Sequence, residues 1–355
     1  MKRKFKLLII DDDKLNRLVA KRFLEREFTV IEASSAAEGF AYLAKQTPDL
    51  MLLDIKMPDM DGFVMMAKLK QDVRLCRIPV IFLTADRSAE TEEKCFQVGG
   101  VDYIAKPFVP PVLQMRVHRT AELEAYRQDL ERMVEEQLAR ITQIQYDVIL
   151  MMANLIESRD GTTGGHVKRA ATFTGMLARR LREKRIYAEW LTTERVLLIE
   201  RAAPLHDIGK IVIPDAVLQK PARLTDAEYK IIQSHAAAGA QIIQDNMSSV
   251  EERDFVQLAT EIAGCHHEKW AGGGYPMGIK GEEIPLGARI MTVADVFDAL
   301  SFKRQYKDDL PLDRVMDIME NERGTTFEPV LLDTFMEMRD ELEQMVAEMR
   351  MKSLI

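Results

Sequence analysis

Histidine and acidic residues are concentrated in one stretch of the second half of the chain. Asp207 directly follows a histidine in the segment APLHDIGK, and a further acid, Asp295, lies in the segment ADVFDAL. Five of the six histidines fall in the same region, namely His166, His206, His235, His266 and His267. Imidazole suits divalent iron, manganese, zinc, nickel and cobalt, and carboxylate bridges favour the harder of these ions. The pattern therefore predicts a metal centre that holds two ions.

A pair of metal ions would supply one kind of hydrolysis. Two ions about 3.5–4 Å apart can hold a phosphate group and lower the pKa of bound water to about 7. Such a centre needs no nucleophilic serine or cysteine. The three cysteines, Cys76, Cys95 and Cys265, are far apart in the sequence, and none belongs to a C-x-x-C pair. We therefore predict metal-assisted hydrolysis of a substrate that carries phosphate.

A glycine-rich segment, HHEKWAGGGYPMGIKGEEIP, follows the last histidines. Glycines at 272, 273, 274, 278 and 281 would let backbone amides approach a ligand closely. Tyr275 offers a ring that can stack on a base. Arg304 and Lys307, three residues apart on one helical face, offer cations to phosphate groups, and arginine can bind them bidentately. These residues predict a substrate that combines bases with phosphates.

A second set of polar residues lies at the ends of short apolar runs in the first 110 residues. Asp11 and Asp12 follow the first run, Asp54 follows residues 50–53, Thr84 ends the next run, and Lys106 ends the last. Parallel strands deliver such residues to one edge of a sheet. Carboxylates there suit Mg²⁺, and a hydroxyl and an ammonium group would bind a phosphoryl group on Asp54. The pattern predicts a phosphorylation site.

The elements that must position these residues differ between the two halves of the chain. Apolar runs at 7–10, 49–53, 80–83 and 101–105 predict buried strands, and helical patterns at 14–27, 36–46 and 62–71 lie between them. This alternation predicts a parallel sheet wrapped by helices. Strand signals nearly vanish over 157–330, which predicts an all-helical domain. A last helix is expected over 328–351, with an apolar stripe for core packing or dimer contact.

The stretch from 111 to 156 has no glycine and carries a heptad pattern. Eight of ten core positions are apolar; the two rows are 123, 130, 137, 144 and 151, and 127, 134, 141, 148 and 155. This spacing is typical of a coiled-coil seam. The alternative is a single amphipathic helix that packs its apolar stripe on its own domain.

Length and composition limit the classes of protein. A chain of 355 residues is expected to form two domains and a connector. Its net charge of −8 argues against a broad basic surface for nucleic acid. Sparse cysteines suggest a reducing compartment, the N-terminus fails as a signal peptide, and no run approaches the ~18 apolar residues of a membrane span. We expect a cytoplasmic protein that binds neither DNA nor membrane.

The first half resembles the receiver domains of two-component systems, over residues 5 to about 120. The segments IIDDD, LLDIKMPDMDG, FLTA and DYIAKPF carry the resemblance. It implies a flavodoxin-like, doubly wound α/β fold with a parallel five-stranded sheet, and a sensor histidine kinase as partner. The implied roles are phosphoacceptor for Asp54, Mg²⁺ binding for Asp11, Asp12 and the backbone of Lys56, a switch pair of Thr84 and Tyr103, and a phosphoryl contact for Lys106.

The second half resembles the HD-GYP family of metallohydrolases, over about 155 to 335. RDGTTGGH, HDIGK, His235, HHE, GGGYP and ADVFDAL occur in the family's order. The resemblance implies hydrolysis of cyclic di-GMP to linear pGpG, with GMP as a further product left open. Two divalent transition metals are implied, iron or manganese first, with nickel, zinc or cobalt as alternatives. The implied ligands are His206, Asp207, His235, His266, His267 and Asp295, with His166 as a further candidate.

The same resemblance assigns the remaining site residues. His206, Asp207 and Lys210 would form the catalytic centre. Lys210, Arg304 and Lys307 would hold substrate phosphates, and Gly274, Tyr275 and Pro276 would form the signature loop. Three positions depart from the family pattern: Ala271 replaces Asp, Gln305 replaces Pro, and Thr162 stands where some members carry a metal-binding Glu. None of these removes a ligand that a two-metal site needs.

We therefore expect a multidomain protein with a receiver over 1–120, a coiled-coil linker helix over 121–156, and an HD-GYP domain with a C-terminal helix over 157–355. A homodimer is expected. One alternative is a catalytically weak domain that binds a cyclic dinucleotide or a GGDEF-domain protein. Another is a phosphodiesterase for cyclic GMP-AMP. A DNA-binding regulator is disfavoured, because no helix-turn-helix pattern follows the receiver.

Overall fold

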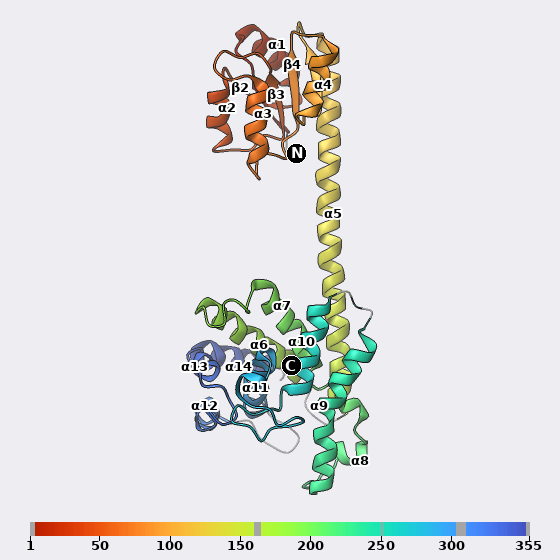
Figure 1. Cartoon of the computed structure of the whole chain (residues 1–355), viewed down its shortest axis with the longest axis vertical. Coiled ribbons are helices and arrows are strands. Elements are labelled where there is room, and N and C mark those ends of the chain that lie inside the picture. The colour runs from red at the N-terminus through yellow and green to blue at the C-terminus, as the bar shows by residue number, and fades with distance from the viewer. Residues whose placement is uncertain (1–3, 160–164, 249, 251, 303–309, 353–355) are drawn as a thin grey trace. The chain divides into compact units, whose positions relative to one another are not determined.

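A computed structural model describes residues 4–159, 165–248, 250, 252–302 and 310–352. The chain forms two compact units, Met1–Ala139 and Arg140–Ile355 (Figure 1). Within the described residues, no helix combines the length and the apolar character that crossing a membrane would require.

The first unit contains a five-stranded parallel sheet in the order β2-β1-β3-β4-β5. Its helices are α1 Lys14–Leu24, α2 Ala36–Leu43, α3 Gly62–Gln71, α4 Ala89–Gln97 and the first part of α5 Pro110–Glu157. The strands are β1 Lys6–Ile10, β2 Thr29–Ala33, β3 Leu50–Asp54, β4 Val80–Thr84 and β5 Asp102–Ala105. The predicted doubly wound α/β receiver fold is therefore confirmed.

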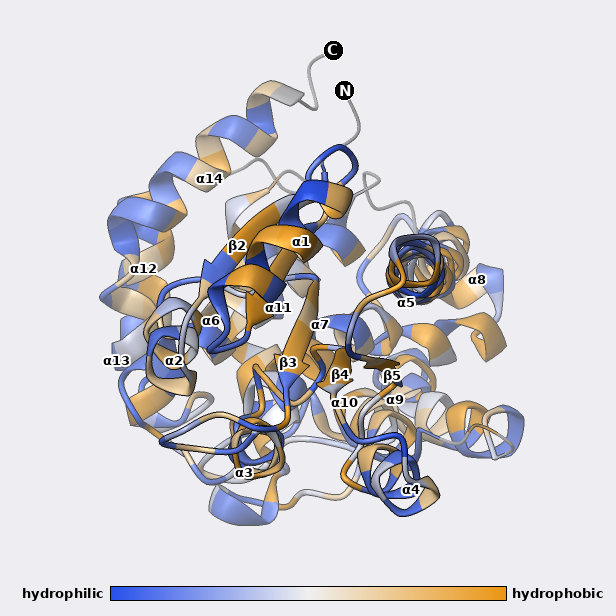
Figure 2. Cartoon of the chain, turned by 90° about the horizontal axis from the view of Figure 1, so that it is seen from above, coloured by the Kyte–Doolittle hydropathy of each residue, from blue (hydrophilic) through white to orange (hydrophobic). Residues whose placement is uncertain are grey.

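Helices cover both faces of this sheet, which explains why its central strands are continuous apolar runs. Leu7 and Ile9 of β1 face one core, shared with α1 and α5. Leu8 and Ile10 face the other core, shared with α2 and α3. The central strands β3 and β4 are accordingly hydrophobic along their length in Figure 2. Strand β2 lies at the edge, where Thr29 and Glu32 are exposed.

Helix α5 is one continuous helix of 48 residues, longer at its N-terminal end than the predicted linker. Its first turns serve the receiver, where Leu113 and Val117 are buried against the sheet. Its last turns serve the second unit, where Ala153 and Ile156 are buried. The eight apolar residues of the heptad lie on another face and are 44–61% exposed. The alternative prediction, that this stripe packs on its own domain, is therefore wrong.

The second unit is helical, as predicted. Its described residues form no strand beyond a single bridge between Arg323 and Phe327. The longer helices are α6 His166–Glu183, α7 Thr193–Ala202, α9 Asp226–Asn246, α10 Arg253–Cys265, α11 Leu286–Ser301 and α12 Leu312–Asn321. Short helices are η1 Ala203–Leu205, η2 Ile208–Val212, α8 Asp215–Leu218 and η3 Gly281–Glu283. Phe297 of α11 packs edge-on against Phe173 and Phe335, which joins three helices in one core.

The predicted helix over 328–351 is two helices, α13 Pro329–Met336 and α14 Arg339–Lys352. The chain turns at Glu337, whose carboxylate pairs with Lys184 at the end of α6. Met338 is buried at this turn, so contacts on both sides of the chain fix the break. Phe335 and Leu342 are also buried, which assigns the apolar stripe to core packing and not to a dimer contact.

Candidate metal centre and phosphorylation site

Two strand ends of the receiver bring buried acids to one cation. Asp11 follows β1 and Asp54 ends β3, and both side chains are buried. Lys106 Nζ lies 2.7 Å from Oδ2 of Asp11 and 2.8 Å from Oδ1 of Asp54. Carboxylate oxygens of Asp11, Asp12 and Asp54 lie within 4.8 Å of one another. Burial raises the pKa of Asp54 to about 6, although Lys106 opposes this shift. The arrangement suits a hard divalent ion.

The other predicted receiver residues, Thr84, Lys56 and Tyr103, differ in their contacts and exposure. Thr84 is buried at the end of β4, and its hydroxyl exchanges hydrogen bonds with the backbone of Asp86 at 3.0 and 3.1 Å. The side chain of Lys56 is exposed. The hydroxyl of Tyr103 forms a hydrogen bond with Glu92 of α4, and this bond raises the pKa of Tyr103. Thr84 and Tyr103 thus contact different neighbours in this structure.

All seven candidate metal ligands of the second unit gather in two adjoining groups. Within each group, one ligand atom per residue lies within 4.8 Å of the others. The first group is Asp207, His235, His266 and His267, and the second is His166, His206 and Asp295. Asp207 connects them, since its carboxylate lies 3.3 Å from Nε2 of both His206 and His235. The structure thus places His166 beside His206 and Asp295 and not apart from them.

The adjacent His206 and Asp207 lie in a turn between the short helices η1 and η2. Gly209 explains how this turn lies so close to α9, which carries His235. A Cβ added at Gly209 would come 2.0 Å from the backbone oxygen of His235 and 2.5 Å from the backbone nitrogen of Gly239. Only a residue without a side chain fits here. The glycine of the HDIGK segment therefore sets the distance between two ligand-bearing elements.

The ring nitrogens that face away from the centre are held by neighbouring groups. Nδ1 of His206, His235 and His266 lies 2.9, 2.6 and 3.0 Å from the backbone oxygens of Ala203, Ile232 and Ile262. Such contacts fix the tautomer and direct Nε2 toward a metal. His166 uses a carboxylate in the same way, because its Nδ1 lies 2.6 Å from Oδ2 of Asp298.

Asp298 and Arg169 complete this support, and sequence reasoning did not identify either. Asp298 is 1% exposed, and Nε of Arg169 donates to it at 2.6 Å. The guanidinium group of Arg169 also lies over the ring of Phe302. Asp298 is the second aspartate of ADVFDAL, three residues after Asp295 on the same helix. That i, i+3 spacing was the available signal, because it places both carboxylates on one face.

The buried atoms at the centre fit bound metal ions. Oδ1 of Asp207, Nε2 of His235 and Nε2 of His266 are buried without a hydrogen-bond partner. Buried polar atoms without partners are rare because they are costly. Burial lowers the pKa of His267 to about 4, and burial and neighbouring histidines hold the pKa of His266 well below its usual value. Both rings are therefore in the neutral form that binds metals.

The predicted signature loop lies over the histidines. The ring of Tyr275 packs on that of His267, with centroids 4.7 Å apart, and its backbone N–H donates to the backbone oxygen of His267 at 3.3 Å. Lys210 Nζ lies 2.7 Å from Oδ2 of Asp207, so a cation also reaches the centre. Gly274 and Pro276 flank Tyr275. Arg304, Lys307, Gln305 and Thr162 lie outside the described residues.

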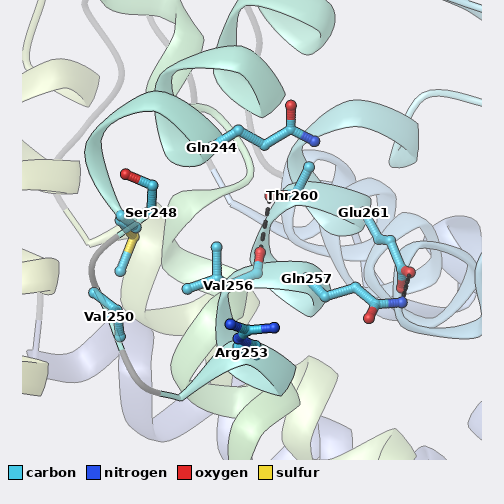
Figure 3. Close-up of a pocket in the computed structure, with 9 residues that line it drawn as sticks. Gln244, Ser248, Val250, Arg253, Val256, Gln257, Thr260 and Glu261 are labelled. Atoms are coloured by element: carbon cyan, nitrogen blue, oxygen red, sulfur yellow. Dashed lines mark hydrogen bonds between the residues drawn. The ribbon is translucent and has the colours of Figure 1, made fainter.

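A separate cavity of about 450 Å³ lies between the end of α9 and the start of α10 (Figure 3). Gln244, Val256 and Thr260 are among its lining residues, and its charged side chains are Arg253 and Glu261. Glu261 is engaged with Gln257, whose Nε2 donates to it at 2.7 Å. None of the predicted site residues lines this cavity.

Comparisons with known proteins cover both units. Residues 7–118 match the response regulator receiver domain, and residues 150–331 match the HD domain. Over 339 residues the chain is 37% identical to a probable cyclic di-GMP phosphodiesterase of Vibrio cholerae, covering 93% of this chain and 77% of that protein. Over 348 residues it is 32% identical to the cyclic di-GMP phosphodiesterase response regulator RpfG of Xanthomonas campestris pv. campestris, covering 95% and 89%.

A relative named for another specificity matches about half of the chain. The 3'3'-cGAMP-specific phosphodiesterase 2 of Vibrio cholerae is 38% identical over 195 residues, which are 55% of this chain and 35% of that protein. HD domains of this kind are metal-dependent hydrolases, in agreement with the two ligand groups. The chain therefore belongs to the family of two-component response regulators that join a receiver domain to an HD-GYP domain.

Proposed function

We propose that this protein hydrolyses cyclic di-GMP to linear pGpG at its metal centre, under control of phosphorylation at Asp54. The observation that carries the proposal is the gathering of seven histidine and aspartate side chains into two adjoining groups around buried atoms without partners. The relatives that match most of the chain are named cyclic di-GMP phosphodiesterases, which supports the choice of substrate.

The two groups would hold two divalent ions. His166, His206 and Asp295 would bind one, and Asp207, His235, His266 and His267 would bind the other. Mixed imidazole and carboxylate ligands favour iron or manganese, with nickel, zinc and cobalt as alternatives. Bound there, the ions would supply charge stabilisation for a phosphodiester and an activated water. Asp207 is positioned to serve both, because it lies between the groups.

Protein side chains would orient the substrate. Lys210 brings an ammonium group to the edge of the centre, 2.7 Å from Asp207, where it can bind a phosphate oxygen. Tyr275 presents an aromatic ring beside the ligand His267, where a base can stack. We assign further phosphate contacts to Arg304 and Lys307, and the signature loop to Gly274, Tyr275 and Pro276. His206, Asp207 and Lys210 form the catalytic centre of this proposal.

The receiver would act as the input. Asp11, Asp12 and the backbone of Lys56 would bind Mg²⁺, Asp54 would accept the phosphoryl group from a sensor histidine kinase, and Lys106 would contact that group. Thr84 and Tyr103 would respond to it as a switch pair. Support comes from the buried Asp11–Lys106–Asp54 arrangement, which brings two carboxylates and a cation together.

We further propose that α5 pairs two copies of the chain. Its exposed heptad places Val134, Ile141 and Val148 in one core row and Leu123, Leu130 and Ile144 in the other. β-Branched residues in the a row, with leucine in the d row, favour a parallel two-stranded coiled coil. The unpaired apolar face of the described helix supports the same reading, because exposed apolar stripes of this length mark interfaces.

Cyclic GMP-AMP is the second candidate substrate. The relative named as specific for 3'3'-cGAMP is 38% identical over 195 residues of this chain. Ala271 lies at an exposed position of the loop. This departure from the family pattern left open the alternative of a catalytically weak domain that binds a cyclic dinucleotide or a GGDEF-domain protein. The backbone N–H of Ala271 donates to the backbone oxygen of Thr325 at 2.8 Å. All seven candidate metal ligands are present despite the substitution, which supports an active enzyme.

A product assay tests the proposal. The metal-loaded protein is incubated in parallel with cyclic di-GMP and cyclic GMP-AMP, and the products are separated by chromatography. We expect pGpG from cyclic di-GMP, and no product from His206→Ala or Asp207→Ala at unchanged circular dichroism. Faster cleavage of cyclic GMP-AMP would select the second candidate, and no cleavage of either would overturn the assignment.

A further inference from the structure

The carboxylate of Glu268 lies between the metal ligands and the signature loop and has no role in the function proposed above. Glu268 directly follows the ligand pair His266–His267 and is 2% exposed. One oxygen, Oε1, accepts hydrogen bonds from the backbone N–H of Met277 at 2.7 Å and of Gly278 at 3.0 Å. These residues follow the Tyr275–Pro276 pair at once. The buried side chain of Glu268 therefore binds the part of the loop that follows Pro276.

The opposite side of the loop leaves no room for adjustment. A Cβ added at Gly274 would come 2.5 Å from Cα of Glu268 and 2.6 Å from the backbone oxygen of His267. The backbone before Tyr275 therefore lies directly on the backbone of the ligand pair. Glu268 holds the backbone after Tyr275. Between these two fixed points, the Tyr275 ring packs on the ring of His267.

The base of the loop is anchored independently of Glu268. The backbone N–H groups of Trp270 and Ala271 donate to Thr326 and Thr325, and that of Gly281 donates to Trp270. Removing the carboxylate should therefore release the middle of the loop without unfolding its ends. The buried carboxylate is also unusual as a purely structural group, because its second oxygen, Oε2, is buried without a hydrogen-bond partner.

We infer that Glu268 is a positioning residue, which fixes the Tyr275 ring for the substrate base by binding the amides of Met277 and Gly278. It touches neither metal nor substrate and acts through the loop. The inference rests on the proposed function for its kinetic readout only. Its structural readout, the protection of the two amides, is independent of any activity.

Hydrogen exchange of the metal-loaded, full-length protein tests the contact itself. A peptide covering residues 274–281 should exchange at least about tenfold faster in Glu268→Ala than in wild type, as expected when a buried hydrogen bond is lost. Glu268→Gln retains an acceptor oxygen and should stay close to wild type. The matched control is Glu282→Ala, an exposed glutamate of the same loop. Unchanged exchange in Glu268→Ala would overturn the inference.

Kinetics and metal content test the consequence. With cyclic di-GMP, Glu268→Ala should raise KM by about tenfold, the effect of one lost hydrogen-bond contribution, while kcat changes little. Bound metal should remain as in wild type, and Glu268→Gln should restore KM. A fall in metal content or in kcat at unchanged KM would assign Glu268 to support of the ligands instead, and so contradict the inference. An inactive wild type with faster exchange in Glu268→Ala would reject the proposed function alone.

Discussion

At the residue scale, the candidate metal centre depends on groups that contact the outer ring nitrogens of its histidines. The carboxylate of Asp298 holds the ring of His166 from behind, and Arg169 holds Asp298. Backbone oxygens do the same for three other histidines. Such outer contacts fix ring orientation and basicity. The charge of Asp298 is balanced by Arg169, so the pair can remain buried.

Removing that outer support should weaken metal binding without removing a ligand. In Asp298→Ala, the imidazole of His166 loses its partner, and we expect a loss of about 10–100-fold in metal affinity or activity. Titration of the apoprotein with Mn²⁺ measures it. Asp317→Ala, at an exposed position of α12, is the control and should behave as wild type. Equal affinities in both variants would show that Asp298 does not tune the centre.

The number of ions is a second prediction at this scale. His166 shares a group with His206 and Asp295, and Glu157, the acid before α6, lies close to the backbone N–H of Val167 at 3.5 Å. Position 162 is a threonine, a poor ligand for a hard cation. We therefore expect two tightly bound ions per chain and early accumulation of pGpG. Elemental analysis after gentle desalting measures the number of ions per chain. Three equivalents of metal per chain, with GMP as the initial product, would contradict the prediction.

Much of the site was predictable from residue types and spacing. The seven candidate ligands, Lys210 and the receiver acids were identified from motifs, because residue type and spacing can be read in the sequence. Asp298, Arg169 and Glu268 were not identified, since their roles depend on which atoms packing brings within hydrogen-bond distance. The hydrogen-bond partner of Tyr103 could not be predicted from the sequence either, because a tyrosine near a strand end can point toward the phosphorylation site or away from it.

At the scale of elements, the close approach of η2 and α9 is the tightest requirement in the second unit. The backbone of Gly209 occupies space that any side chain would need, next to the backbone of His235 and Gly239. The absence of a Cβ at Gly209 thus allows the two segments that carry candidate ligands to lie in close contact. The helical character of both segments followed from the sequence, but this contact between them did not.

Gly209→Ala tests this requirement. The added methyl group must push η2 away from α9, and overpacking of this kind costs about 1–3 kcal/mol. We expect a lower Tm together with loss of bound metal, because His206, Asp207 and His235 would move apart. The control is Gly264→Ala, whose Cβ would come no closer than 3.3 Å to another atom. Thermal unfolding at wild-type temperature with full metal content would refute the argument.

The seam of α5 gives a second prediction at this scale. Ile141→Glu with Val148→Glu places like charges at two core positions of the proposed dimer and should weaken it strongly. Light scattering at tens of micromolar measures the change. Ala139→Glu with Gln143→Glu adds the same charge to the same exposed helix outside the seam and should leave the dimer intact. A monomeric wild type, phosphorylated or not, would refute pairing through α5.

Element prediction succeeded where periodicity was strong and failed where burial was partial. The central strands of the receiver are fully apolar because both faces are covered. Edge strand β2 was missed because it has only five residues and buries only the last of them, Ala33. The last helix was predicted as one because its apolar stripe continues through the turn at Glu337, which only tertiary contacts reveal.

At the scale of the whole molecule, the phosphorylation site and the metal centre belong to different compact units. One helix, α5, contributes residues to the cores of both. We therefore propose that an effect of Asp54 on hydrolysis passes along α5 or through pairing of its exposed seam. A change in pairing would bias both catalytic units of a dimer together.

Phosphorylation should require Asp54, and its effect should require the seam. Acetyl phosphate with Mg²⁺ should label wild type but not Asp54→Asn, because Asn lacks the nucleophilic oxygen, and mass spectrometry measures this. It should change the hydrolysis rate of wild type only. The Ile141→Glu, Val148→Glu protein should accept the label but show no change in rate. A response in Asp54→Asn, or an unchanged response in the seam variant, would contradict this route.

If the exposed seam pairs chains as proposed, it would also determine which chains pair within one cell. Aliphatic core residues of one regulator fit those of a related regulator nearly as well as their own, so they provide little discrimination. Arg127 and Gln137 interrupt the seam at core positions, and polar residues there select register and partner at a cost in stability. The separation of this signalling route from that of any related regulator in the same cell would then rest on two side chains.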